Sequence, residues 1–218
     1  MDAGLRAGCD RLPLFLEGSA AMTTQLLQLA VLMMAAAIAA AGPQQNEQVE
    51  QGQIPSKGGG TLPYKIARLA PAAFTQLPGA VRAELEKRGC LVPQTFRASQ
   101  PENAISGAFR EAGTADWAVL CSREGYSSIL VFWKASAESV AELGRRKDTE
   151  DLLASESQDS ARYARFISAA SPDWIRRKKH NKKVGPLEHD GIEDGLLGQG
   201  SLIHYFRGNG WVELEGRH

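Results

Sequence analysis

Several features that mark specialised classes of protein are missing from this 218-residue chain. Its 25 basic and 25 acidic side chains cancel, so the net charge predicts no general attraction to nucleic acid or another polyanion. No glycine-rich phosphate loop precedes a helix, because Gly58-Gly59-Gly60 lies in a polar segment. No serine has the Gly-x-Ser-x-Gly context of a hydrolase nucleophile, and no internal repeat is found.

The remaining composition is that of an ordinary globular protein. Apolar residues make up 43% of the chain and charged residues 23%, which excludes disorder of the whole chain. The length has room for one domain and an appendage. All four tryptophans lie in the C-terminal half, where we expect the core.

No apolar stretch reaches the roughly 20 residues that a membrane span needs. The longest, Leu26–Ala41, has one polar interruption at Gln28 and ends in alanines before Gly42. This pattern is typical of a signal peptide with an Ala-x-Ala cleavage site, so we expect export and assign residues 1–41 to the leader region. Met22 is an alternative start, with residues 1–21 an upstream over-extension, and an uncleaved membrane anchor is the alternative to cleavage. Cleavage leaves no membrane span.

Cysteine content agrees with export. Removal of the leader removes Cys9 and leaves Cys90 and Cys121. In an oxidising compartment two cysteines are more often paired than free, so we expect a disulfide between them. Closing a loop of about 30 residues stabilises a fold by roughly 3–4 kcal/mol in the chain-entropy model. Two buried thiols, or a reactive thiol at Cys90, are the alternatives.

The polar segment after the leader predicts a linker. Residues 42–63 are rich in Gln, Gly and Pro and lack hydrophobic periodicity, so they offer little apolar surface to offset the entropy of ordering. We expect a flexible linker over 42–63 and a single domain over 64–218.

Local patterns in the first half of this domain predict one helix and three strands. A helix is expected between Pro78 and Gly89, and strands over Asn103–Glu111, Asp116–Ser122 and Ser127–Lys134. The last strand is apolar on both faces, as in a central strand covered on both sides. These strands predict an antiparallel β-meander.

The second half alternates weaker and stronger signals. We expect a short helix over Ala137–Leu143, a loop over 145–160, a strand over Tyr163–Ile167 and a helix from Pro172 to about His180. A C-terminal β-hairpin is expected around Gly208-Asn209-Gly210. The fold class is therefore α+β, with the meander and the hairpin packed against two or three short helices.

A basic run is the first candidate binding site. It contains Arg176, Arg177, Lys178, Lys179, Lys182 and Lys183. Such a patch can bind a phosphate-rich polymer, an anionic lipid surface or an acidic protein. The alternative is a solvated helix end whose cations favour the negative pole of the helix dipole.

A second candidate combines a histidine with three acids. His189, Asp190, Glu193 and Asp194 could bind a divalent cation, or act as a base with an orienting carboxylate. Their spacing is irregular for a calcium loop, so the alternative is an acidic loop before the hairpin. His204 is interpreted as a packing residue. The sequence indicates no catalytic set and no cofactor.

Four segments resemble a group of small exported bacterial proteins that has no assigned biochemical function. They are DWAVLCS (116–122), ILVFW (129–133), HDGIED (189–194) and HYFRGNGWVELEG (204–216). The resemblance covers about residues 77–216. It implies a periplasmic or secreted α+β domain and transfers no functional residue.

A second segment, ISGAFREAGTADWAVL (105–120), is similar to the repeat of integrin-type propellers, in which an acidic loop binds calcium. Here most of that motif's acids are absent and a single copy is present. The chain is too short for a propeller.

These observations favour an exported, non-catalytic domain that binds a cell-envelope or extracellular component. The expected partner is an envelope protein or an anionic polymer, with no specific nucleic acid. The alternative is a metal-assisted hydrolase centred on His189, Asp190, Glu193 and Asp194. A structural protein without a specific ligand is a third hypothesis.

Overall fold

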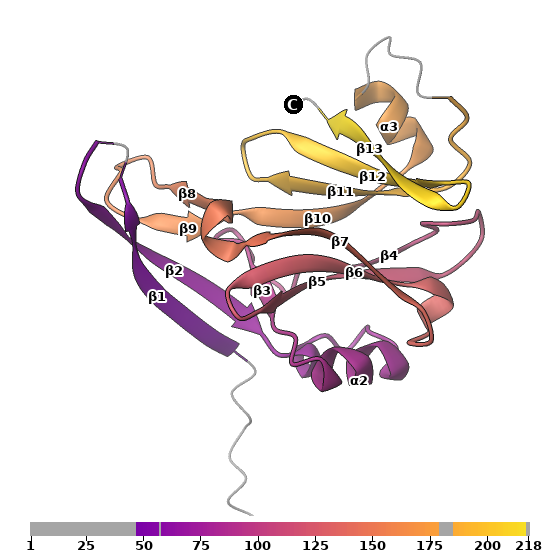
Figure 1. Ribbon diagram of the computed structural model, residues 1–218, viewed down its shortest axis with the longest axis horizontal. Helices are drawn as coiled ribbons and strands as arrows, with labels where there is room; N and C mark the ends of the chain where they lie inside the picture. The colour runs from indigo at the N-terminus through magenta and orange to yellow at the C-terminus, as the bar shows by residue number, and fades with distance from the viewer. Residues whose placement is uncertain (1–46, 57, 179–184, 217–218) are drawn as a thin grey trace, which may run out of the picture. The chain divides into compact units, whose positions relative to one another are not determined.

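Three β-sheets dominate the computed structural model, which describes residues 47–56, 58–178 and 185–216 (Figure 1). The leader region, residues 1–41, lies outside this range. The mixed α+β class with a β-rich core is confirmed. Within the described residues, the helices all fall short of the length and apolarity that a membrane crossing requires.

The first sheet has the order β1-β2-β9-β8, with β3 also paired to β2. Its pairs are antiparallel except for β2 with β9. The strands are β1 (Glu47–Pro55), β2 (Thr61–Leu69), β3 (Val92–Gln94), β8 (Leu152–Ala154) and β9 (Ala161–Tyr163).

The second and third sheets are antiparallel and follow chain order. The second contains β4 (Ala104–Gly107), β5 (Asp116–Arg123), β6 (Tyr126–Phe132) and β7 (Val140–Lys147). The third contains β10 (Arg165–Ala170), β11 (Gly191–Leu196), β12 (Ser201–Arg207) and β13 (Gly210–Gly216).

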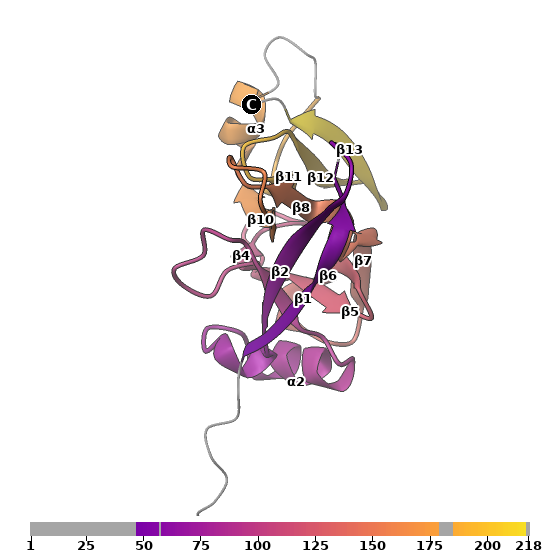
Figure 2. The same cartoon turned by 90° about the vertical axis from the view of Figure 1, so that its left-hand side faces the viewer.

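Two α-helices lie on the outer sides of these two sheets. Helix α2 (Gly79–Lys87) lies beside the β4–β7 sheet, and helix α3 (Pro172–Lys178) lies beside the β10–β13 sheet (Figure 1). Figure 1 shows α2 against the β4–β7 sheet, the β10–β13 sheet on its other side, and α3 beyond that. Figure 2 shows the same order after a quarter turn. The described residues also contain three short 3-10 turns: η1 (Pro71–Ala73), η2 (Trp133–Ala135) and η3 (Asp148–Asp151).

The β4–β7 sheet is buried on both faces where its central strands carry unbroken apolar segments, residues 117–121 in β5 and 129–132 in β6. Val119 and Leu130 lie on the face that packs against α2. Leu120 and Ile129 lie on the opposite face, with Ile192 from the β10–β13 sheet. The predicted two-sided burial of the strand after Tyr126 is therefore confirmed.

Helix α2 follows its sequence signals closely. Val81 and Leu85 are fully buried, and Glu84 forms an ion pair with Arg88 at 2.7 Å. Gly89 ends the helix with a φ of +68°, a left-handed conformation that glycine adopts without strain.

The predicted disulfide is present between Cys90 and Cys121 (S–S 2.00 Å). It connects the segment after α2 to the middle of β5, and both sulfurs belong to the buried core. The alternatives of two free thiols or a reactive Cys90 are therefore wrong.

The linker prediction for residues 42–63 is wrong where β1 and β2 occupy it. Nine residue pairs join the two strands, so main-chain hydrogen bonds order a segment whose side chains are mostly polar. Tyr64 adds a side-chain contact by donating to Glu50 at 2.7 Å. The prediction failed because composition shows only that apolar side chains are scarce here, and it does not indicate whether the backbone pairs with another strand.

The predicted helix over Ala137–Leu143 is also wrong, because β7 begins at Val140. Lys134 and Ala135 both have positive φ angles, +49° and +57°, and they reverse the chain so that Val140 pairs with Phe132. Pairing with the edge of the buried strand β6 therefore outweighs the weak helical preference of this segment.

Other elements differ from prediction mainly in their boundaries. The strand expected over Asn103–Glu111 is confined to β4, and residues 145–160 contain the end of β7, η3 and β8. The strand expected over Tyr163–Ile167 is divided at Ala164 between β9 and β10. Helix α3 begins as predicted and is described to Lys178.

Candidate functional site

The structure does not bring the predicted metal ligands together. Glu193 and Asp194 are consecutive in β11 and point to opposite faces, as successive residues in a strand must. Glu193 accepts hydrogen bonds from Ser168 and Ser201 (2.8 and 2.7 Å). Asp194 lies on the other face and binds Arg165.

His189 and Asp190 are engaged elsewhere. The imidazole of His189 stacks on Tyr205 with 4.3 Å between ring centroids. The Asp190 carboxylate accepts the amide of Ala108 at 3.0 Å. Within the described ranges, no three His, Cys, Asp or Glu side chains could share a metal ion. Strand alternation and local hydrogen bonds therefore separate the four residues that the sequence suggested as metal ligands.

The basic run is described only as far as Lys178, and Lys179, Lys182 and Lys183 lie outside the described residues. Arg176 pairs with Asp173 at 2.7 Å, and the ammonium of Lys178 lies 4.9 Å from the ring centre of Trp174. Arg177 is exposed. These contacts are those of a helix end.

The loop that is similar to a calcium-binding repeat is closed by protein groups. The Asp116 carboxylate accepts the amides of Phe109 (2.9 Å), Arg110 (3.2 Å) and Lys134 (2.8 Å). Asp116 is only 1% exposed. This carboxylate therefore ties the loop before β5 to the turn after β6.

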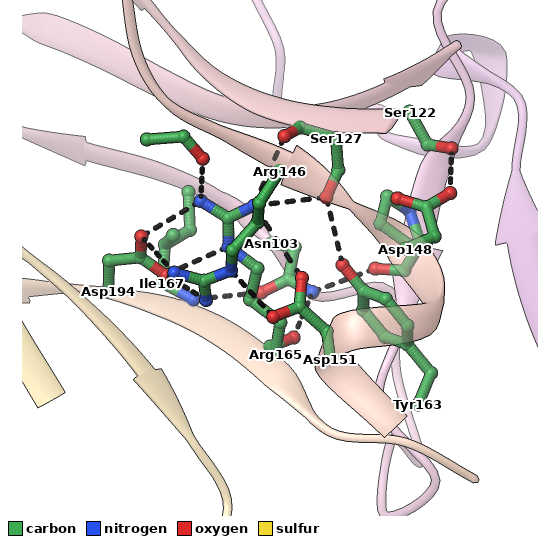
Figure 3. A network of polar contacts seen from close by, with 12 residues as sticks. Asn103, Ser122, Ser127, Arg146, Asp148, Asp151, Tyr163, Arg165, Ile167 and Asp194 are labelled. Carbon is green, nitrogen blue, oxygen red and sulfur yellow. Dashed lines mark hydrogen bonds and ion pairs between the residues drawn. The ribbon is translucent and has the colours of Figure 1, made fainter. Parts of the chain in front are cut away.

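A fully buried arginine organises the main polar network of the protein (Figure 3). Arg165, at the start of β10, donates from Nε and Nη2 to the two oxygens of Asp194 (2.9 and 2.8 Å). Its Nη1 donates to the Ser127 hydroxyl (3.0 Å), and Nη2 also donates to the Gly144 carbonyl (2.7 Å). Bidentate pairing of this kind fixes both partners.

Further ion pairs extend the network to all three sheets. Arg146 of β7 bridges Asp151 (2.6 Å) and Asp194 (3.2 Å). In the first sheet, Arg68 of β2 pairs with Asp148 at 2.6 Å and donates to Ser122 of β5 at 2.9 Å. The network therefore locks the three sheets in one arrangement.

Asn103 adds a neutral link. Its side-chain amide donates to the carbonyls of Pro93 (2.7 Å) and Arg165 (3.2 Å), and its carbonyl accepts the amide of Ile167 (3.0 Å). Asn103 has a left-handed backbone conformation (φ +69°), and its buried side chain contacts both β3 and β10.

The pKa values of two acids in the network are shifted in opposite directions. Burial opposes the charge of Asp194, but its basic neighbours lower its pKa to about 2. Nε2 of His204 is 3.7 Å away, too far for a hydrogen bond, so Arg165 is the main cause. Burial raises the pKa of Asp151 to about 6, and the cations of Arg146 and Arg165 offset only part of that effect.

We expect Asp151 to give the protein a measurable pH dependence. Its folded-state pKa is raised, so its contribution to stability is complete below its ordinary value of 3.8 and is lost as the pH rises through about 6. Asp151→Asn cannot titrate. Between about pH 4 and pH 7 the wild type should lose roughly 2 kcal/mol relative to this variant. Urea unfolding of both proteins at both pH values measures this change, and a constant difference would contradict it.

The network is a structural element, because its central groups are closed to solvent. Arg165, Asp194 and Asp151 are at most 3% exposed. A substrate cannot reach them without opening the interface between sheets. The functional surface must therefore lie elsewhere.

A half-exposed aromatic cluster with an arginine over it is the strongest candidate. We call Arg110, Trp133, Phe206 and Trp211 the aromatic–arginine surface. Trp133 stacks on Trp211 with centroids 5.6 Å apart, and Phe206 meets both rings edge-on at 5.3 and 5.4 Å. The guanidinium carbon of Arg110 lies 5.5 Å from the Trp133 ring centre and 5.3 Å from that of Phe206.

Three separate elements build this surface. Phe206 and Trp211 are directly opposite each other in the β12–β13 pair. Trp133 follows β6 at the turn with two left-handed residues, and Asp116 fixes both that turn and the amide of Arg110. Non-glycine residues with positive φ are costly and gather at functional sites.

A hollow of about 300 Å³ adjoins the surface. Arg110 and Phe206 are shared between the two, and the remaining wall includes Glu188, His189, Tyr205 and Arg207. The site thus combines flat aromatic faces with two guanidinium groups, and it opens to solvent.

This surface is not among the sites that the sequence indicated. The hairpin turn predicts that Phe206 lies opposite Trp211, so half of the cluster could have been found. Nothing near Arg110 or Trp133 in the sequence shows that they join it.

No family model, curated protein or solved structure matches the chain.

Proposed function

We propose that the protein is an exported, periplasmic or secreted domain that binds an anionic saccharide through the aromatic–arginine surface. The saccharide would be a component of the cell envelope or of the medium outside it. The observation that carries this proposal is the Arg110 guanidinium lying over half-exposed rings of Trp133 and Phe206.

The chemistry of the surface favours a charged sugar over other envelope components. An aromatic face packs well against the apolar C–H face of a pyranose ring, and tryptophan offers the largest such area. Guanidinium groups recognise carboxylate or phosphate through two parallel hydrogen bonds. A surface that presents both therefore fits a ring with an acidic substituent.

Export is supported by the apolar leader and the buried disulfide. Structural disulfides persist in oxidising compartments and are rare in the cytosol. The Cys90–Cys121 bond lies in the core cluster around α2 and β5, so the fold includes it as a structural element.

The test is a calorimetric titration of the full chain with hexagalacturonate, with a neutral hexasaccharide in parallel. We expect binding of the acidic oligosaccharide to weaken about tenfold in Arg110→Gln, because a charged hydrogen bond is worth roughly 1.5–3 kcal/mol. The side chain of Arg110 is exposed, so the fold should be unaffected.

Arg177→Gln is the matched control, since it removes one exposed cation from α3. It should leave the affinity within about twofold of wild type, because Arg177 is not part of the aromatic–arginine surface and salt screens exposed charges. Absence of binding, or an equal loss in both variants, would overturn the proposal.

A further inference from the structure

A β-bulge in β7 sets the direction of the Arg145 side chain. Ser127 pairs with Arg146 and Ile129 with Leu143, so two residues of β7 oppose Ser128 alone. The first of the two, Gly144, has a φ of +57°, which is the glycine-containing type of bulge. The bulge places the Arg145 guanidinium 4.3 Å from the ring centre of Tyr126.

The buried network fixes this bulge in place. The Gly144 carbonyl accepts a hydrogen bond from Arg165 (2.7 Å). A Cβ atom on Gly144 would lie 2.9 Å from Arg165 Nη2 and 3.1 Å from Asp194 Oδ2. The direction of Arg145 is therefore set by a bulge whose glycine is bonded to the buried network.

Two further arginines reach the same place from other elements. Arg123 pairs with Tyr126 across a two-residue turn, in which Glu124 and Gly125 both have positive φ (+52° and +76°). Arg88 follows α2 and uses Nε for its ion pair with Glu84. With Arg145, they line an open hollow of about 370 Å³.

We propose that this hollow, which we call the three-arginine pocket, binds the phosphate group of a small ligand. Three guanidinium groups carried by three separate elements suit a group with oxygens on all sides, whereas a planar carboxylate uses one such fork. Tyr126 and Ser128 also line the pocket. This site is separate from the aromatic–arginine surface and does not depend on its function.

Two acidic residues in the pocket wall weaken the attraction of the pocket for an anion. Glu124 and Glu142 also line the pocket, so they oppose an anion there. Removing either carboxylate should strengthen phosphate binding, while removing an arginine should weaken it. The opposite signs distinguish a specific pocket from general surface charge.

The experiment is an NMR titration of the full chain with inorganic phosphate at constant ionic strength, with acetate as the reference anion. We expect saturable shifts in the amides around Arg123, Tyr126 and Arg145. Arg145→Gln should weaken phosphate binding about tenfold, and Glu142→Gln should tighten it severalfold. Arg110→Gln, in the other site, should change nothing.

A titration with glycerol 3-phosphate identifies the source of the phosphate. Tighter binding than that of inorganic phosphate supports the pocket with a phosphomonoester as its ligand, and equal binding supports it with the free ion. Equal shifts with acetate, or weaker binding in Glu142→Gln, would overturn the proposal.

Discussion

Replacing Arg165 with methionine is expected to lower the free energy of unfolding by about 3–5 kcal/mol. The guanidinium is completely buried and neutralises Asp194 and Asp151, at 2.8 and 3.6 Å. Methionine fills a similar volume but leaves these acids short of a cation and the Gly144 carbonyl without its donor. Urea unfolding monitored by tryptophan fluorescence measures the loss.

Arg162→Met is the control for this prediction. Arg162 lies in the adjoining strand β9 and is exposed, with its guanidinium carbon 4.3 Å from the ring centre of Phe96. An exposed cation–π contact is worth about 0.5–1 kcal/mol. If the two variants lost equal stability, the account of Arg165 as the centre of the fold would be wrong.

Removing the disulfide is expected to cost about 3–4 kcal/mol. Cys90 and Cys121 are 31 residues apart, and a crosslink over such a loop restricts the unfolded chain by that amount in the chain-entropy model. The double variant Cys90→Ala/Cys121→Ala should unfold at lower urea concentration than the oxidised wild type.

Dithiothreitol provides the control for the disulfide prediction. The reductant should bring the wild type to about the stability of the double variant and leave the variant unchanged, because Cys90 and Cys121 pair only with each other. A wild type whose urea midpoint is insensitive to reductant would contradict the structural role of this bond.

Local signals explain what the sequence predicted correctly. Helix α2 has its apolar face, its ion pair and its terminal glycine within a dozen residues. Strands β5 and β6 each contain an unbroken apolar segment, residues 117–121 and 129–132. The pairing of two cysteines required only their number and an oxidising compartment.

Long-range contacts explain what the sequence could not show. Arg165 is one of 25 basic residues, and its partners Asp194 and Ser127 are 29 and 38 positions away. The helix predicted over 137–143 is displaced by pairing with β6. Strand β1 depends on β2 in the same way.

The candidate site shows both limits at once. The turn before Trp211 predicts its pairing with Phe206, whereas the loop that carries Arg110 is held by hydrogen bonds to Asp116. The acids after His189 look like ligands in sequence, yet alternation along β11 points neighbours to opposite faces. Proximity in sequence therefore suggested a ligand set that the acids do not form, and it gave no indication that Arg110 joins the cluster.

The four tryptophans provide the most direct test of the proposed binding surface. Trp133 and Trp211 belong to it, whereas Trp117 packs in the cluster around α2 and Trp174 lies in α3. In a titration with hexagalacturonate, the indole N–H signals of Trp133 and Trp211 should shift saturably while those of Trp117 and Trp174 remain in place. A shift confined to Trp174, or no shift at any of the four, would contradict the account.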